Sequence, residues 1–378
     1  PWEKVKVAEH LFWGRHIPGL HGLASHDRES AMATIRASRP DLVVALEAEQ
    51  RSVAGLRDAI KSGPYPLGTG DTELARVFAW RFWALVGEQG CIGAVLPRAA
   101  TLSAPGMAPW RQAIIDRGGF TDVCALVNNR GWVFADVHPQ YSVALATINK
   151  CTPPLREVEM DGPYRSMDDY VAGRNEETRP VPVDEFRNWS NGASFPLLPG
   201  KHSISIYRQL ARHPRFGTHP RLKFRPLAEV HATNDKQFFK FGPDRPPGAW
   251  PVYSGSAINL WTPETGEVYA WTDAKVITEH LRSKARAQAR HTSSGFSGMS
   301  DEELAGDAAA PFLRPRIVFR NITNATNSRT VIVALAPPHV IPHHGAPYLL
   351  RRNGSLADEA YLLGVLSSRP LDWWARRH

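Results

Sequence analysis

The first third of the chain carries apolar residues at helical spacing. The set that predicts a helix from about residue 41 to 60 is Leu42, Leu46, Val53, Leu56 and Ile60. A second set predicts a helix over about 72–85, and its members are Leu74, Val77, Phe78, Phe82 and Leu85. Asp41 and Asp71 precede these stripes as candidate helix caps, and Gly90 ends the second helix.

Three short apolar runs predict strands after these helices. They cover residues 91–97, 121–127 and 142–148, and the first run ends at Pro97. A further helix is expected near 108–117. Helices and strands therefore alternate, which is typical of an α/β sheet whose faces are covered by helices.

The composition changes near residue 151 and predicts a division of the chain. Residues 151–194 are rich in Pro, Asp, Glu and Arg with little periodicity, so we interpret them as a linker or adapter. Residues 195–378 alternate short β-prone runs with basic and proline-rich loops, which predicts a second, mixed α/β domain. We therefore expect separate domains over 1–150 and 195–378.

Composition and charge narrow the class of protein. With 43% hydrophobic and 22% charged residues among 378, the chain is neither disordered nor fibrous. Lys and Arg (45) exceed Asp and Glu (37), a formal charge of +8 that suits either a polyanionic partner or simple solubility. Three cysteines are too few for a disulfide framework, which favours a reducing, cytoplasmic compartment. The sequence contains no apolar run long enough to predict a membrane span.

Several stretches, taken in order, resemble one family of enzymes. Pro1-Trp2 resembles the end of the NPPW or NPPY motif of adenine-N6 DNA methyltransferases. Four further stretches resemble parts of the large methylases of type IIG and phage-exclusion restriction–modification systems, in the same order along the chain. These stretches are residues 62–100, 128–150, 314–350 and 361–377. The resemblance implies the second half of a Rossmann-like methyltransferase sheet followed by a mixed α/β target-recognition domain. It also implies that the chain is an internal piece of a longer protein.

The resemblance further implies a site that holds an adenine flipped out of DNA. In the family, the motif's Asn side chain and a Pro carbonyl accept hydrogen bonds from the adenine amine, and the motif's aromatic residue stacks on the ring. Pro1 and Trp2 match the motif here, Phe134 matches an aromatic expected against the other face of the base, and Tyr141 is a further candidate. The alternative is that Pro1-Trp2 is a chance dipeptide and that the other aromatics are packing residues.

The implied methyl donor is S-adenosyl-L-methionine. The family binds it mainly at a glycine-rich turn after the first strand, upstream of the NPPW motif. Residues 68–71 are glycine-rich but follow a proline-rich loop, so we assign no cofactor-binding residue in this chain. We expect the chain alone to be inactive, with a missing N-terminal half or other defence-system subunits as partners. The alternative is a non-catalytic DNA-specificity subunit that pairs with a separate donor-binding chain.

The implied partner is double-stranded DNA, whose phosphates are contacted by Lys, Arg and backbone amides. The basic candidates for this contact are Lys275, Arg282, Lys284, Arg286, Arg290 and Arg320. Those between 282 and 290 wrap around a helix rather than form one stripe, so a solvated surface helix is the alternative. We expect no metal, because His339, His343 and His344 lack the paired Cys or helical spacing of zinc ligands.

Overall fold

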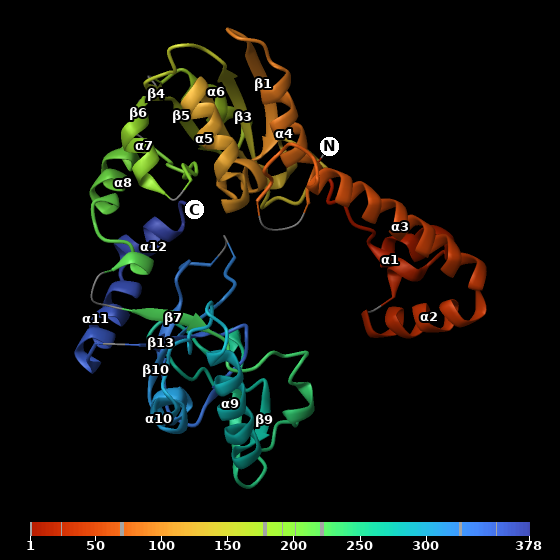
Figure 1. Ribbon diagram of the computed structural model, residues 1–378, viewed down its shortest axis with the longest axis vertical. Helices are drawn as coiled ribbons and strands as arrows, with labels where there is room; N and C mark the ends of the chain where they lie inside the picture. The colour runs from red at the N-terminus through yellow and green to blue at the C-terminus, as the bar shows by residue number, and fades with distance from the viewer. Residues whose placement is uncertain are drawn as a thin grey trace. The chain divides into compact units, whose positions relative to one another are not determined.

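The computed structural model describes residues 2–23, 25–68, 72–176, 180–190, 192–200, 202–219, 223–324, 327–352 and 354–378. The chain divides into two compact units, Pro1–Ile204 and Ser205–His378. Both units contain helices and β-sheets (Figure 1), so the prediction of a mixed α/β protein is confirmed. None of the helices in the described ranges combines the length and the apolar character that a membrane span needs.

Three helices open the first unit, and they are α1 (Glu9–His16), α2 (Ser25–Ser38) and α3 (Pro40–Lys61). They lie side by side (Figure 1) and bury an apolar core around Trp13. Helix α3 starts with Pro40, whose missing N–H costs nothing at this position. The sequence predicts Asp41 as the cap, but its carboxylate instead binds the Arg39 guanidinium at 2.9 and 2.6 Å. This hydrogen-bonded pair lowers the pKa of Asp41 to about 2.

A four-stranded sheet with the order β1-β3-β2-β5 forms the centre of the first unit. Its strands are β1 (Cys91–Pro97), β2 (Gly119–Val127), β3 (Ser142–Asn149) and β5 (Met160–Tyr164). Strand β3 runs antiparallel to both β1 and β2, whereas β5 runs parallel to β2 at the edge. The predicted strands are confirmed for β1, β2 and β3. A short, continuous apolar run suits the largely buried β2 and β3, whereas edge strand β1 alternates exposed and half-buried residues before its buried end.

Helices cover this sheet, and they are α4 (Leu74–Leu85), α5 (Ala108–Arg117) and α6 (Met167–Arg174). Helix α4 contacts β1, α5 contacts β2 and α6 contacts β5. The Trp110 indole of α5 is fully buried, and its N–H donates to the carbonyl of Ala79 in α4 at 3.0 Å. A short π-helix, Ala99–Ser103, follows β1. Helix α5 confirms the helix expected near 108–117.

The segment interpreted as a linker or adapter builds structure onto the first unit. It contributes the edge strand β5, helix α6, the antiparallel pair β4 (Glu157–Val158) and β6 (Val181–Pro182), and helix α7 (Val183–Trp189). The Phe186 ring of α7 lies 4.7 Å from that of Phe195, centroid to centroid, and both residues are buried. Helix α8 (Ser203–Ala211) spans the division between the two units.

The second unit contains two further sheets. The first has the order β11-β10-β13-β7, and its strands are β7 (Phe224–Leu227), β10 (Arg316–Phe319), β11 (Val333–Ala336) and β13 (Tyr348–Arg351). The second has the order β12-β8-β9, and its strands are β8 (Ala249–Tyr253), β9 (Ala270–Asp273) and β12 (Ile341–Pro342). The helices of this unit beyond α8 are α9 (Ala274–Ala289), α10 (Asp301–Ala305), α11 (Leu356–Leu366) and α12 (Arg369–Ala375).

A buried ion pair lies inside the second unit. The Arg316 guanidinium in β10 donates to both carboxylate oxygens of Glu229, at 2.8 and 2.9 Å, and to the Val340 carbonyl at 2.7 Å. The same guanidinium lies over the Tyr348 ring, 5.4 Å from its centroid. Burial raises the pKa of Glu229 to about 7, while the neighbouring Arg316 acts to lower it.

Candidate functional site

Two aromatic residues that lie more than a hundred positions apart in sequence meet at the sheet of the first unit. The ring centroids of Trp2 and Phe134 are 5.6 Å apart, and the planes cross at 86° in an edge-to-face contact. Trp2 is partly buried against a cluster that includes Leu126 of β2 and Val143 of β3. Phe134 belongs to the connection between these strands and is 38% exposed. Trp2 and Phe134 therefore form one aromatic site at the surface of the sheet.

The geometry of this pair determines how a base could enter. Two rings that hold a base between them lie parallel and leave room for the base. Trp2 and Phe134 instead contact each other edge to face, so a base stacks between them only after one ring turns about its side-chain bonds. Phe134 is the more exposed of the two and lies in a loop rather than in a strand.

The other two residues predicted for this site are Pro1 and Tyr141. Pro1 lies outside the residues that the structure describes. Tyr141 is 56% exposed, and its ring lies 6.5 Å from that of His138, centroid to centroid. In the described part of the chain, no ring contact joins Tyr141 to Trp2 or Phe134.

A polar cluster lies beside the aromatic site. The Tyr164 hydroxyl donates to the Asp161 carboxylate, whose Oδ1 also accepts the Gly162 N–H at 2.8 Å. Arg174 of α6 binds Asp161 at 3.2 Å and Asp122 at 3.0 Å. Burial and the Asp161 carboxylate raise the pKa of Tyr164, so its hydroxyl stays protonated and acts as a donor.

The thiol of Cys124 faces the same cluster. Burial, with a smaller contribution from Asp161, raises the pKa of this thiol to about 12. A nucleophilic cysteine needs a lowered pKa, because the thiolate is the reactive form. Cys124 is also 1% exposed and belongs to the buried cluster with Leu126 and Val143, so it is a packing residue.

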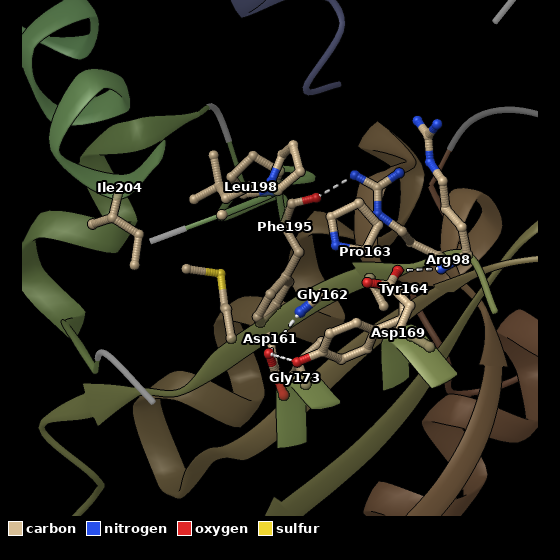
Figure 2. A pocket seen from close by; sticks show the side chains of 18 of the residues that line it. Arg98, Asp161, Gly162, Pro163, Tyr164, Asp169, Gly173, Phe195, Leu198 and Ile204 are labelled. Carbon is tan, nitrogen blue, oxygen red and sulfur yellow. Dashed lines mark hydrogen bonds between the residues drawn. The ribbon is translucent and has the colours of Figure 1, made fainter. Parts of the chain in front are cut away.

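A cavity of about 430 Å³ opens next to this cluster (Figure 2). Small apolar residues of the sheet line it, among them Ala125 and Ala144, together with Phe195 and the Asp161–Tyr164 segment. The Tyr164 hydroxyl turns toward the Asp161 carboxylate at its wall (Figure 2). This volume falls in the range of small-molecule sites, about 300–1,000 Å³.

Tyr164 connects the cavity with the aromatic site. It lines the cavity, and it belongs to the apolar cluster against which Trp2 packs. Neither Trp2 nor Phe134 is among the residues that line the cavity. The two features thus share one side chain without being one pocket.

Sequence reasoning missed Asp161, Tyr164 and Arg174. A signal was present, since Asp161-Gly162-Pro163-Tyr164 places a carboxylate and an aromatic on either side of a tight bend. The Gly162 φ of +79° is left-handed, and a Cβ there would lie 2.3 Å from the Ala125 carbonyl oxygen. The signal was overlooked because the segment has the composition of a linker.

Three of the six predicted DNA-contacting residues form hydrogen bonds with backbone carbonyls of the second unit. Arg282 donates to the carbonyl of Ala305 at 2.8 Å, and Lys284 donates to that of Glu229 at 2.7 Å. Arg320 donates twice to the Ile258 carbonyl, at 3.0 and 2.7 Å. These three cations stabilise the unit itself, because each satisfies a backbone carbonyl.

The other three predicted residues are Lys275, Arg286 and Arg290. All three are exposed, and they lie in or directly after helix α9. Within the described residues, no hydrogen bond or ion pair engages their charged groups. The Asp273 side chain caps α9 by accepting the N–H groups of Lys275 and Val276, each at 3.0 Å.

Three histidines gather in the second unit without forming a metal site. The rings of His231 and His344 stack at 4.0 Å, and that of His343 lies 4.9 Å from His344, measured between centroids. The Nδ1 atom of each ring accepts a backbone N–H, so the proton of the neutral ring lies on Nε2. Burial lowers the pKa of His343 to about 4. Across the described ranges, no group of three His, Cys, Asp or Glu residues is arranged to hold a metal.

Comparisons with known proteins give a distant likeness only. No family model matches the chain, and no curated protein matches it. The type IIG restriction endonuclease BpuSI is 14% identical over 84% of this chain and 41% of its own length, with a TM-score of 0.33. The type IIL restriction–modification enzyme MmeI, solved in complex with DNA, is 10% identical over 79% of this chain and 38% of its own, with a TM-score of 0.39. The chain thus spans about two fifths of each, and we base its function on its own residues.

Proposed function

We propose that this chain is the downstream part of a DNA adenine-N6 methyltransferase of a restriction–modification or phage-defence system. The observation that carries the proposal is the contact between Trp2 and Phe134. The resemblance assigned these two residues to opposite faces of one base from separate stretches of sequence. Their meeting at the surface of one sheet supports a shared role.

The proposed reaction depends more on the placement of the adenine amine than on chemical activation of that amine. The exocyclic amine of adenine is a poor nucleophile because its lone pair is delocalised into the ring. The enzyme flips the base out of the duplex and holds its amine in line with the methyl group. Trp2 and Phe134 supply the stacking that repays part of the cost of unpairing the base, about 1–3 kcal/mol per stacked base.

Among the residues that the structure describes, we find no counterpart of the glycine-rich turn at which the family binds S-adenosyl-L-methionine. Among the described residues, no strand leads through a connection with more than one glycine into a helix. The family binds its methyl donor at a glycine-rich turn between a strand and a helix. At such a turn the ligand can approach the backbone N–H groups of the helix N-terminus closely. We therefore place the donor outside this chain and assign no step to it here.

Removal of either ring is the first test. With the donor-binding part supplied from the coding sequence upstream, Trp2→Ala and Phe134→Ala should each slow methyl transfer by about 5- to 150-fold, the equivalent of one stacking interaction. The measurement is incorporation of tritiated methyl groups into adenine. Tyr361→Ala is the control, since it removes an aromatic that is 70% exposed on α11. Unchanged rates in both variants would remove the aromatic site from the mechanism.

The second unit carries the proposed DNA-contacting face. We assign phosphate contacts to the exposed Lys275, Arg286 and Arg290, and not to the three cations that bind backbone carbonyls. Counterion release makes such contacts sensitive to salt. The slope of log affinity against log salt changes by about one for each cation that no longer neutralises a phosphate.

Neutralising this face should weaken binding and flatten its salt dependence. We expect the triple variant with Gln at 275, 286 and 290 to bind a random duplex more weakly and with a slope reduced by about three. The matched control removes three exposed charges from the first unit, at Arg51, Arg81 and Arg117. Filter binding across salt concentrations measures both slopes. A parent that binds with no salt dependence would refute any DNA-binding role.

A non-catalytic DNA-specificity subunit is the second candidate. The absence of a donor-binding turn from the described residues favours it. In that case the salt-dependent DNA affinity persists, while Trp2→Ala and Phe134→Ala leave methyl transfer by a partner chain unaffected.

A further inference from the structure

The connection between β2 and β3, residues 128–141, is organised around one buried amide. Asn128 is 0% exposed. Its Nδ2 donates to the carbonyls of Phe134 at 2.9 Å and Val137 at 2.8 Å. Its Oδ1 accepts the N–H groups of Val133 at 3.1 Å and Phe134 at 2.9 Å.

The backbone of Asn128 completes this arrangement. Its N–H donates to the Tyr141 carbonyl at 2.9 Å, and its carbonyl accepts the Gly131 N–H at 2.9 Å. Every polar atom of Asn128 therefore has a partner within the connection. A buried amide that is fully paired has no hydrogen-bonding capacity left for a ligand, so its role is structural within the loop.

Phe134 is the residue that this amide holds from both sides. The Asn128 side chain binds both the N–H and the carbonyl of Phe134. The ring of Phe134 remains 38% exposed and faces Trp2. The backbone of Phe134 is thus fixed while its ring stays available, which is the arrangement expected of a preorganised contact residue.

We propose that Asn128 is a positioning residue, which fixes the Phe134 backbone so that the ring can stack on an extruded nucleobase. This inference rests on the proposed function. Asn128 itself does not touch the base. Its contribution is that the loop is ordered before binding, so that binding does not have to supply the ordering.

The substitution Asn128→Asp changes the chemistry of the side chain with almost no change of shape. The carboxylate keeps the acceptor for Val133 and Phe134 but loses both N–H donors. When ionised, it places negative charge against the carbonyls of Phe134 and Val137. When protonated, it regains one donor, because a neutral carboxyl carries one O–H. Burial favours that protonated form and raises the pKa of the introduced group.

The experiment uses the full chain and a 20-base-pair duplex with 2-aminopurine opposite an abasic site, since an unpaired base is extruded at low cost. Quenching of 2-aminopurine fluorescence reports stacking. We expect Phe134→Ala to weaken binding of this probe by about 5- to 150-fold. We expect Asn128→Asp to weaken it about tenfold at pH 8, with part of the loss recovered, relative to the parent, as the pH falls toward 5.5.

The double variant Asn128→Asp/Phe134→Ala separates positioning from general packing. If Asn128 acts through Phe134, the double variant binds no more weakly than Phe134→Ala alone. Losses that add in full, or an Asn128→Asp variant that binds like the parent while Phe134→Ala is impaired, would overturn the inference and leave the proposed function intact. An unimpaired Phe134→Ala would overturn the proposed function and the inference with it.

A folding defect has a separate control. Circular dichroism and thermal unfolding of Asn128→Asp establish whether the first unit is folded. If it is not, Asn128→Ser takes its place, because a hydroxyl satisfies one of the partners and introduces no charge. The same comparison with Phe134→Ala then applies.

Discussion

Replacing Arg316 with methionine should destabilise the second unit by about 3–5 kcal/mol. The substitution removes the cation that binds both oxygens of Glu229 in a site where both side chains are at most 3% exposed. It leaves a buried carboxylate, the Val340 carbonyl without its donor, and a cavity beside Tyr348. Hydrogen exchange in urea, read on peptides from β10 and β13, measures this local free energy.

The control for Arg316 replaces both partners of the ion pair. Arg316→Met/Glu229→Leu removes the uncompensated charge, and double replacements of this kind are often neutral or stabilising. The double variant should therefore be clearly more stable than Arg316→Met. If Arg316→Met alone stays within about 1 kcal/mol of the parent, the pair does not have the structural role that its geometry indicates.

Replacing Arg111 with methionine should destabilise the first unit by about 2–6 kcal/mol. Arg111 lies in α5 and is 0% exposed. Its guanidinium donates to the carbonyls of Thr101 at 2.7 Å, Ala104 at 3.1 Å and Gly192 at 2.8 Å. Burial lowers its pKa to about 10, so the group remains charged at neutral pH. Methionine fills much of the volume but removes the guanidinium donor from the Thr101 and Gly192 carbonyls, while the Ala104 carbonyl keeps the Met107 N–H at 3.1 Å.

Arg117, six residues further along the chain, provides the matched control for Arg111. It is exposed in the last turn of the same helix, so Arg117→Met should change the stability by less than about 0.5 kcal/mol. Hydrogen exchange on peptides from α5 and β2 compares the two variants. Equal stability of Arg111→Met and Arg117→Met would contradict the role assigned to the buried guanidinium.

The aromatic site shows how far sequence can lead toward function. The resemblance pointed to Trp2 and Phe134, and the structure brings them into contact. The resemblance could not predict the edge-to-face geometry of the two rings or the hydrogen bonds from the Asn128 side chain to the Phe134 backbone. These depend on the path of the loop after β2, where the local pattern of apolar residues ends. Tyr164 was missed for another reason, since its segment has the composition of a linker and gives no sign that it joins the sheet as strand β5 beside β2.

Part of the sheet of the first unit follows from the order of the amino acids alone, whereas its edge strand β5 and helix α6 lie in the segment that the sequence indicates as a linker. Strands β1, β2 and β3 and helix α5 are predicted by apolar runs and spacings, because the burial of neighbouring side chains along one element is a local property. The role of each cation, in contrast, depends on the folded chain. Arg111 and Arg316 turn inward to carbonyls and a carboxylate, whereas Arg286 and Arg290 stay exposed on and directly after α9. An arginine in the sequence does not indicate whether its guanidinium will be buried or exposed. Its role depends on the hydrogen-bond acceptors that distant segments bring to it.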